Sequence, residues 1–158
     1  MSEYQLAQIN IAKARDAMDS ETMKGFVDRL DEINALADES EGFVWRLQDE
    51  GGDATSIKAF DDPDMIVNMS VWESIEPLKH FVYRTVHVDL IRDREEWFHK
   101  IAESHQALWW IPKGHIPTVE EGIEKLGLLQ KNGPSSEAFT FAKPAPMPSQ
   151  TASAFVEN

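Results

Sequence analysis

The order in which the hydrophobic period changes along the chain constrains its fold more than any other feature. Residues 5–13 (QLAQINIAK) alternate apolar and polar side chains, the pattern of a strand with one apolar face. Between residues 19 and 40 the apolar side chains recur every three or four positions, which predicts a helix with one apolar stripe. Residues 43–48 (FVWRLQ) have a strand composition and are followed by turn residues. The first third of the chain therefore predicts a strand–helix–strand unit.

The same order of elements recurs in the second half of the chain. Residues 65–72 (MIVNMSVW) alternate again and predict a third strand. Ser74 is a residue type that caps helices, so a second helix is expected from Ile75, with a bend or break near His87. Residues 105–115 (HQALWWIPKGH) predict a fourth strand. Two strand–helix–strand units in succession predict an α+β fold, the ferredoxin-like split βαβ arrangement with an antiparallel sheet.

The C-terminal part of the sequence predicts one more helix and then a tail. Residues 118–121 (TVEE) form a capping box, in which the hydroxyl and the carboxylate satisfy backbone amides of the first turn. Residues 132–134 (NGP) end this helix, and residues 138–141 (AFTF) favour a fifth short strand. Three prolines and several small polar residues follow. We therefore expect a single domain over residues 1–142 and a flexible C-terminal tail over residues 143–158.

Large aromatic side chains indicate that both faces of the predicted sheet are covered. Trp109 and Trp110 are neighbours in one strand, so their side chains point to opposite faces. One of them is expected under the helices and the other toward the lumen or a partner subunit, and the register leaves open which. Together with Trp72, the second face would expose an apolar patch too large for a monomer. We therefore expect a homodimer formed through the helix-free face of the sheet.

Composition excludes several classes of function. The chain has 158 residues, of which 42% are hydrophobic, enough for one core. It is acidic: 15 Lys plus Arg against 28 Asp plus Glu give a net charge of -13, which disfavours nucleic acid and membrane surfaces as partners. The absence of cysteine excludes thiolate catalysis and disulfides. No apolar run approaches the roughly 18 residues of a membrane span, and we expect a cytoplasmic protein.

The densest group of chemically active side chains lies in residues 80–87 (HFVYRTVH). In a helix, His80, Tyr83, Arg84 and His87 fall on one side. The two imidazoles could serve as acid and base, while the phenol and the guanidinium could orient a substrate or stabilise an anion. These four residues are therefore the expected catalytic group. The alternative is a polar helix face on which Arg84 pairs with a carboxylate and the histidines are half-buried.

Amides and a hydroxyl among aromatic side chains predict the wall of a small-molecule pocket. The expected substrate-pocket residues are Asn10, Asn68, Ser70, Trp72, Trp109 and Trp110. Alternatively, the polar residues face water at strand positions and the tryptophans pack the core or a dimer interface. The histidines are scattered, with no H-E-x-x-H pattern, and no glycine-rich phosphate loop occurs, so we expect no metal and no tightly bound cofactor.

Two long segments resemble a known family. Residues 67–98 (VNMSVWESIEPLKHFVYRTVHVDLIRDREEWF) and 107–141 (ALWWIPKGHIPTVEEGIEKLGLLQKNGPSSEAFTF) are similar to an uncharacterised bacterial family that belongs with the antibiotic-biosynthesis-monooxygenase-like dimeric α/β barrels. The resemblance covers about residues 4–142. It implies two ferredoxin-like subunits packed sheet to sheet, each with a cavity between its sheet and its helices. Members of that superfamily include cofactor-independent oxygenases of aromatic polyketides, haem-degrading enzymes, decarboxylases and binding proteins, so the fold alone does not settle the chemistry.

Three functions follow as hypotheses. The first is a small-molecule enzyme, a cofactor-independent monooxygenase acting on an aromatic or enolisable substrate. The second is a non-catalytic small-molecule-binding protein of the dimeric α/β barrel type, and the third is a haem-binding or haem-degrading protein. For haem, the resemblance implies a site at Asn10 and Trp72, but the expected position of the axial ligand is nearer Ile91 than His87. Haem is therefore the weakest of the three.

Overall fold

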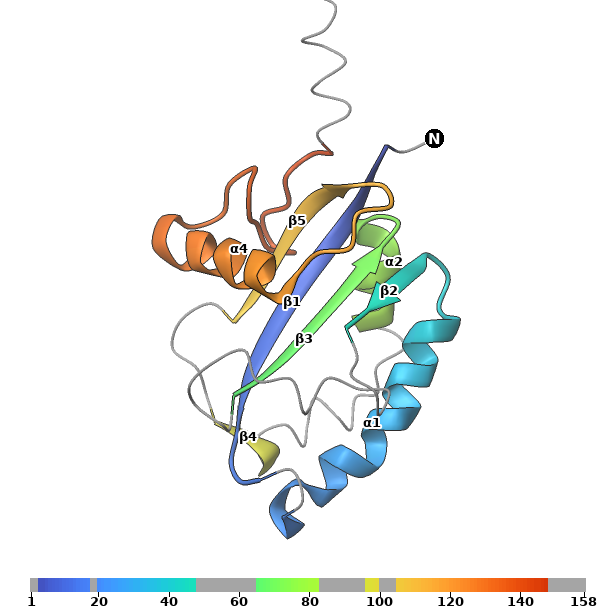
Figure 1. The fold of residues 1–158 in the computed structure, drawn as a ribbon, viewed down its shortest axis with the longest axis vertical. Coiled ribbons are helices and arrows are strands. Elements are labelled where there is room, and N and C mark those ends of the chain that lie inside the picture. Colours follow the sequence, from blue (N-terminus) through green and yellow to red (C-terminus); the bar gives the residue numbers. More distant parts are fainter. Residues whose placement is uncertain (1–2, 18–19, 48–64, 83–95, 100–104, 148–158) are drawn as a thin grey trace, which may run out of the picture.

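The computed structural model describes residues 3–17, 20–47, 65–82, 96–99 and 105–147. Except at residues 98–99 and 138–141, its helices and strands follow the order that the hydrophobic periods predict (Figure 1). The elements are β1 (Tyr4–Ala14), α1 (Glu21–Glu39), β2 (Phe43–Arg46), β3 (Met65–Trp72), α2 (Ile75–His80), β4 (Phe98–His99), β5 (Gln106–Pro112) and α4 (Val119–Asn132). Of the helices described, none is long and apolar enough to cross a membrane.

The strands form one antiparallel sheet in which β1 is central. Strand β3 pairs with one edge of β1 and is flanked by β2, while β5 pairs with the other edge. The order β2-β3-β1-β5 is that of the split βαβ arrangement, so the predicted α+β, ferredoxin-like fold class is confirmed. The two-residue strand β4 extends the β5 edge at the far end of β1, a pairing that no sequence pattern indicates.

Alternation along β1 separates two faces of the sheet. Ala7, Ile9 and Ile11 lie on one face, where they pack with Leu126 and Leu129 of α4 in the larger hydrophobic core. The intervening residues of β1 face the opposite side, which α1 and α2 cover. The expectation that helices cover only one face is therefore wrong: α4 lies across β1 and β5 on the face expected to be bare (Figure 1).

The register of β5 settles how the paired tryptophans are placed. Trp109 is buried under α4, and its Nε1 donates to Oε2 of Glu121 at 2.9 Å. Trp110 lies on the other face, where its ring packs against Phe139 and its Nε1 donates to the Ala145 carbonyl oxygen at 2.9 Å. The first residues after 142, predicted to belong to a tail, thus contact the sheet.

The position of Trp72 also differs from the expected dimer face. It was expected on the helix-free face of the sheet, but it is 1% exposed and packs against Phe81, the residue that follows α2. The face that carries Trp72 is the one covered by α1 and α2. Trp72 therefore contributes nothing to an exposed patch on the surface of the single chain.

The helix ends follow the predicted signals in part. The Thr118 hydroxyl accepts from the Glu121 backbone N–H at 3.1 Å, and Gly133 ends α4 with a φ of 77°, as the capping box and stop signal predict. Ser74 precedes α2 as predicted, but its side chain makes no capping hydrogen bond. The expected fifth strand over residues 138–141 is only an isolated bridge between Leu108 and Phe139.

Candidate ligand-binding site

A cavity of about 320 Å³ lies between the sheet and the helices α1 and α2. Cavities of this size hold small molecules of a few rings. The helix α1 contributes apolar side chains from its inner stripe, and the residues around the end of α2 close the other side. The described lining consists of Gln8, Asn10, Ala12, Phe26, Leu30, Ile33, Asn34, Ala37, Phe43, Arg46, Ile66, Asn68, Ser70, Trp72, Leu78, Phe81, Val82, Trp97, Phe98 and Gln106.

Polar side chains gather in the middle of the cavity floor, which we call the polar belt. It is formed by two neighbouring rows of residues paired across the strands. These rows are Gln8–Ser70–Arg46 and Gln106–Asn10–Asn68. Neighbouring rows on one face of a sheet are about 7 Å apart, because every second residue of a strand faces the same side. The polar belt therefore spans about the width of one aromatic ring system between two apolar ends.

Hydrogen bonds connect three side chains of the polar belt, those of Gln8, Asn68 and Ser70. The Gln8 Nε2 donates to Oδ1 of Asn68 at 2.7 Å and to Oγ of Ser70 at 2.9 Å. The Trp72 Nε1 donates to the same Ser70 oxygen at 2.9 Å. Gln8 and Ser70 are buried, so breaking these bonds would leave polar atoms away from bulk water. The network holds Gln8, Asn68 and Ser70 in one arrangement.

Aromatic rings form both ends of the cavity. At one end the Trp72 ring packs between Phe43, whose centroid is 5.4 Å away and edge-on, and Phe81, whose centroid is 5.3 Å away. The other end is formed by Phe26, Trp97 and Phe98. Aromatic walls favour flat apolar rings, because offset and edge-on ring pairs add to the free energy of burial. The cavity is therefore suited to a flat molecule that carries polar groups away from its apolar ends.

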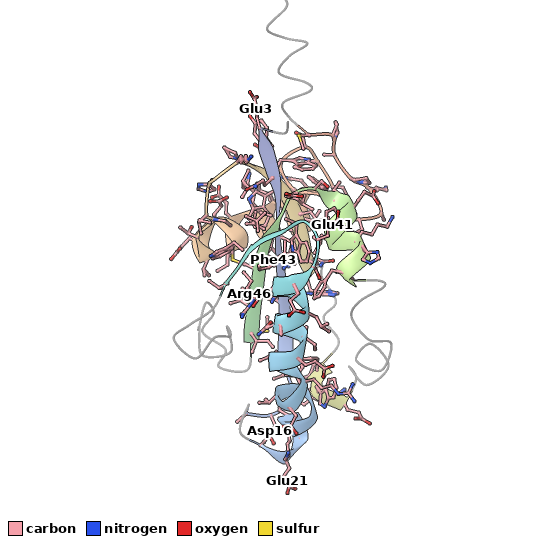
Figure 2. All side chains as sticks on the ribbon, turned by 90° about the vertical axis from the view of Figure 1, so that its right-hand side faces the viewer. Glu3, Asp16, Glu21, Glu41, Phe43 and Arg46 are labelled. Atoms are coloured by element: carbon pink, nitrogen blue, oxygen red, sulfur yellow. The ribbon has the colours of Figure 1, made fainter. Side chains whose placement is uncertain are left out.

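The charge of the described lining is confined to one side chain. Arg46 is the only ionisable residue among the described residues that line the cavity. Its Nε lies 2.8 Å from Oδ1 of Asp38, and its second terminal nitrogen lies 3.3 Å from Oδ2 of the same carboxylate. Figure 2 shows Phe43 and Arg46 on β2 beside α1, the helix that carries Asp38. The ion pair positions a guanidinium at a cavity whose described lining is otherwise uncharged.

The structure brings four of the predicted pocket residues together. Asn10, Asn68, Ser70 and Trp72 all line the cavity. Trp109 and Trp110 do not belong to the lining. As described above, one packs under α4 and the other under the segment after that helix. The sequence alone could not assign the two tryptophans to faces, because the assignment requires the register of β5 against β1.

The predicted catalytic residues lie mostly outside the described ranges. His80 is the last residue of α2, and its side chain is exposed and does not belong to the described cavity lining. Tyr83, Arg84 and His87 lie in residues 83–95, which the structure does not describe. Their convergence on one side of a helix therefore stays a prediction. Within the described ranges, no cluster of three or more His, Asp or Glu side chains could hold a metal ion.

Sequence reasoning missed Gln8 and Arg46. The signal for Gln8 was present, because it stands two residues before Asn10 on the same face of β1. A polar residue at this place in a central strand must find a partner, and its partners are Asn68 and Ser70. Arg46 gave a weaker signal, because a short edge strand with a bulge does not reveal which face its side chains take.

An antiparallel ferredoxin-like sheet with a cavity under two helices defines the class of this protein as a small α+β fold. The chain belongs to the DUF3291 family, described as a domain of unknown function, whose profile matches residues 5–155. This membership agrees with the uncharacterised family expected from the sequence. Among curated proteins, none matches the chain.

Solved structures with a similar chain path include a protein of unknown function, NE2512, from Nitrosomonas europaea, with a TM-score of 0.48, 9% identity and coverage of 73% of this chain and 95% of that chain. SnoaB from Streptomyces nogalater, a cofactor-independent oxygenase, gives a TM-score of 0.47 and 10% identity over 73% of this chain and 97% of that chain. A candidate antibiotic biosynthesis monooxygenase from Chloroflexus aurantiacus gives a TM-score of 0.41 and 17% identity over 73% of this chain and 98% of that chain. Values this low assign no activity to the chain.

Proposed function

We propose that the cavity binds a flat, largely aromatic molecule with oxygen substituents and that the protein acts on it as a monooxygenase without a bound cofactor. The observation that carries the proposal is the polar belt between two aromatic ends in a cavity of about 320 Å³. A cavity built only for packing would bury apolar side chains at these positions, because buried polar groups cost free energy unless they are paired.

The reaction of such an enzyme requires no electrons from the protein, because the substrate itself reduces O₂. An enolisable or phenolic substrate loses a proton, and the resulting carbanion passes electrons to O₂. One oxygen atom of O₂ becomes a carbonyl oxygen of the product, and the other leaves as water. The two hydrogens of this water come from the oxidised methylene of an enolisable ketone, or from the hydroxyl and the oxidised ring carbon of a phenol. No external reductant is consumed. The protein must hold the rings and stabilise the enolate oxygen, tasks for which aromatic walls and hydrogen-bond donors such as Asn68 are suited.

The base remains a proposal from the sequence. We assign the acid and base roles to His80 and His87, and the orientation or stabilisation of the anion to Tyr83 and Arg84. Because the His80 side chain is exposed and lies outside the described lining, His87 is the first variant to test. The expected pattern is that His87→Ala lowers turnover by about 10²-fold or more, while His80→Ala has the smaller effect.

Oxygen consumption with anthrone tests the activity. Anthrone is a three-ring ketone whose central methylene is acidic, and its oxidation by one O₂ yields anthraquinone and one water. We expect turnover above the protein-free rate near neutral pH. Ser74→Ala is the matched control, because this hydroxyl makes no capping bond and lies outside the described lining. Absence of turnover with anthrone and with its hydroxylated derivatives, despite binding, would contradict the monooxygenase proposal.

The second candidate is a non-catalytic binding protein. It is favoured by one observation: in the described part of the lining, Arg46 is the only ionisable side chain, and it is paired with Asp38. A pocket without an acid or base can still bind tightly. Binding of aromatic ketones that is unaffected by His80→Ala and His87→Ala, with no oxygen uptake, would establish this function in place of the enzyme.

A haem-binding function has less support. Asn10 and Trp72 line the cavity, but the lining includes no histidine within the described ranges. The described residues therefore offer no imidazole as an axial ligand, and we assign haem no step in the mechanism. The expected result of a haem titration at micromolar protein is no shift of the Soret band. A shift that His87→Ala abolishes would overturn this assignment.

We also propose that the chain forms a homodimer through the sheet face on the side of α4. Helix α4 contacts β1 and β5, while Trp45, Leu47 and Met65 beside it are only partly buried in the single chain. A second copy would complete their burial. Light scattering should give twice the mass of the single chain, 17.9 kDa. Trp45→Glu should yield the monomer, and a wild-type monomer would refute the proposal.

A further inference from the structure

The Ser70 hydroxyl is the best-defined polar group in the cavity. Its oxygen accepts from Trp72 Nε1 and from Gln8 Nε2, both at 2.9 Å. An indole N–H can only donate, and so can an amide nitrogen, so these two contacts occupy both lone pairs of the hydroxyl oxygen. The Ser70 proton must therefore point in the one remaining tetrahedral direction.

No acceptor in the described part of the chain takes that proton. The hydroxyl makes no side-chain hydrogen bond beyond the two that it accepts. Its neighbour across the sheet on the β2 side is Arg46, and a guanidinium has no acceptor atom. Ser70 lines the cavity and is 7% exposed, so its surroundings leave the cavity as the place for an acceptor.

Gln8 orients a second donor in the same way. By donating to Oδ1 of Asn68, it leaves the amide nitrogen of Asn68 as the group available to the cavity. One buried side chain thus sets the direction of two neighbouring residues, which lie two positions apart on β3. Ser70 and Asn68 thus both direct a hydrogen-bond donor toward the cavity. A site of this kind favours a carbonyl oxygen or an oxyanion over an N–H or O–H group.

We propose that Ser70 donates a hydrogen bond to an acceptor oxygen of the bound molecule, and that Gln8 is the positioning residue that turns the Ser70 proton into the cavity. This inference rests on the proposed function in one respect, that the cavity binds flat aromatic molecules. It adds which atom of the bound molecule is contacted: the oxygen of a ketone, an enolate or a phenolate. Molecules of the same shape that offer only a donor or no polar group at all are disfavoured.

Three probes of nearly equal shape test the inference by equilibrium dialysis. In 9-fluorenone a carbonyl stands where fluorene has a methylene and where carbazole has an N–H donor. We expect 9-fluorenone to bind about 5-fold more tightly than fluorene, the free energy of one net hydrogen bond, and carbazole to show no such gain. Ser70→Ala should bring 9-fluorenone down to the affinity of fluorene while fluorene itself binds as before.

The variant Gln8→Glu separates positioning from simple stabilisation. At pH 8 a carboxylate can only accept, so it should draw the Ser70 proton toward itself and leave a lone pair facing the cavity. The preference for 9-fluorenone over fluorene should vanish, and carbazole should gain affinity. A residue that only supports the fold would lower the affinity of all three probes together. Gln5→Glu is the matched control, because Gln5 is also buried on β1 but faces the other side of the sheet.

The outcomes distinguish the two proposals. If none of the three probes binds, the proposed function is wrong and this inference falls with it. If 9-fluorenone and fluorene bind equally to the wild type, or if Ser70→Ala leaves their ratio unchanged while circular dichroism shows a folded chain, only the donor role of Ser70 is refuted. If Ser70→Ala does not fold, Trp72→Phe, which removes one of the two donors that orient the hydroxyl, should weaken the preference for 9-fluorenone.

Discussion

The two faces of the sheet are built from alternate residues of the same strands, yet they differ in how closely a helix approaches them. On the α4 face, a Cβ added at Gly122 would lie 2.9 Å from Cδ1 of Ile9 and 3.1 Å from Sδ of Met69, so helix and sheet are in direct contact. On the opposite face, α1 and α2 leave a cavity of about 320 Å³ above Gln8 and Ser70.

This difference separates a closely packed face of the sheet from a face that retains a cavity. Close packing excludes water and gains dispersion energy, so the α4 face should carry much of the free energy of folding. A cavity forgoes those contacts, and its polar belt adds the requirement that every buried polar atom be paired. Among the described residues, no buried side-chain nitrogen or oxygen lacks a hydrogen-bond partner, so the cavity face meets that requirement. The two faces should therefore respond differently to mutation.

The largest expected effect is a loss of stability on the α4 face. Trp109→Ala removes a fully buried indole and the donor to Glu121, and it should lower the free energy of unfolding by about 3–5 kcal/mol. Urea denaturation measures this loss. The affinity of the folded variant for 9-fluorenone should stay within about twofold of the wild type, a difference below ~0.5 kcal/mol. A large loss of affinity in the folded variant would mean that the two faces are not separate.

A matched pair of alanines on β1 compares the faces directly. Ala7 lies in the closed core and Ala12 lines the cavity. Ala7→Leu must force its neighbours apart and should cost about 1–3 kcal/mol of stability. Ala12→Leu has space to occupy and should cost less than about 1 kcal/mol, while probe affinity falls by about tenfold, equivalent to ~1.4 kcal/mol. Equal destabilisation by the two variants would show that the cavity is closed in solution.

Two glycines of α4 sharpen the comparison further. Alanine in place of glycine inside a helix stabilises by about 0.5–1 kcal/mol when nothing obstructs the new methyl group. Gly127 has no atom within 4 Å of an added Cβ, so Gly127→Ala should show this gain. Gly122→Ala must displace Ile9 and Met69, and it should lower stability despite the same gain in helix propensity. Thermal unfolding of both variants checks the sign of each change.

The sequence predicts the two faces well because a strand has a strict period of two. The alternation in residues 65–72 placed Asn68, Ser70 and Trp72 on one face, and the structure finds all three in the cavity lining. The order of strands and helices was enough to predict the antiparallel ferredoxin-like sheet. These inferences need only local patterns, which the sequence contains in full.

What could not be predicted depends on contacts between distant segments. An amphipathic pattern shows that α4 has an apolar stripe but not which face of the sheet it packs against. The expectation that this face of the sheet is bare was therefore wrong. In the same way, Gln8 is recognisable as a polar strand residue, but its pairing with Ser70 needs the register of β1 against β3. Glu121 fits a capping box locally, yet its carboxylate is directed to Trp109 and His115.

The smallest expected effect concerns that carboxylate. Burial raises the pKa of Glu121, but the hydrogen bonds from His115 and Trp109, together with the charges of His115 and Lys125, outweigh burial, and the pKa lies below its ordinary value of 4.5. A carboxyl with a lowered pKa in the folded state stabilises the fold above its unfolded pKa, and this contribution is lost as the pH falls below about 4.5. Glu121→Gln should therefore flatten the loss of stability with acid, measured by urea denaturation from pH 6 to 3. The exposed Glu124→Gln on the same helix is the control, and an unchanged slope in Glu121→Gln would contradict the assignment.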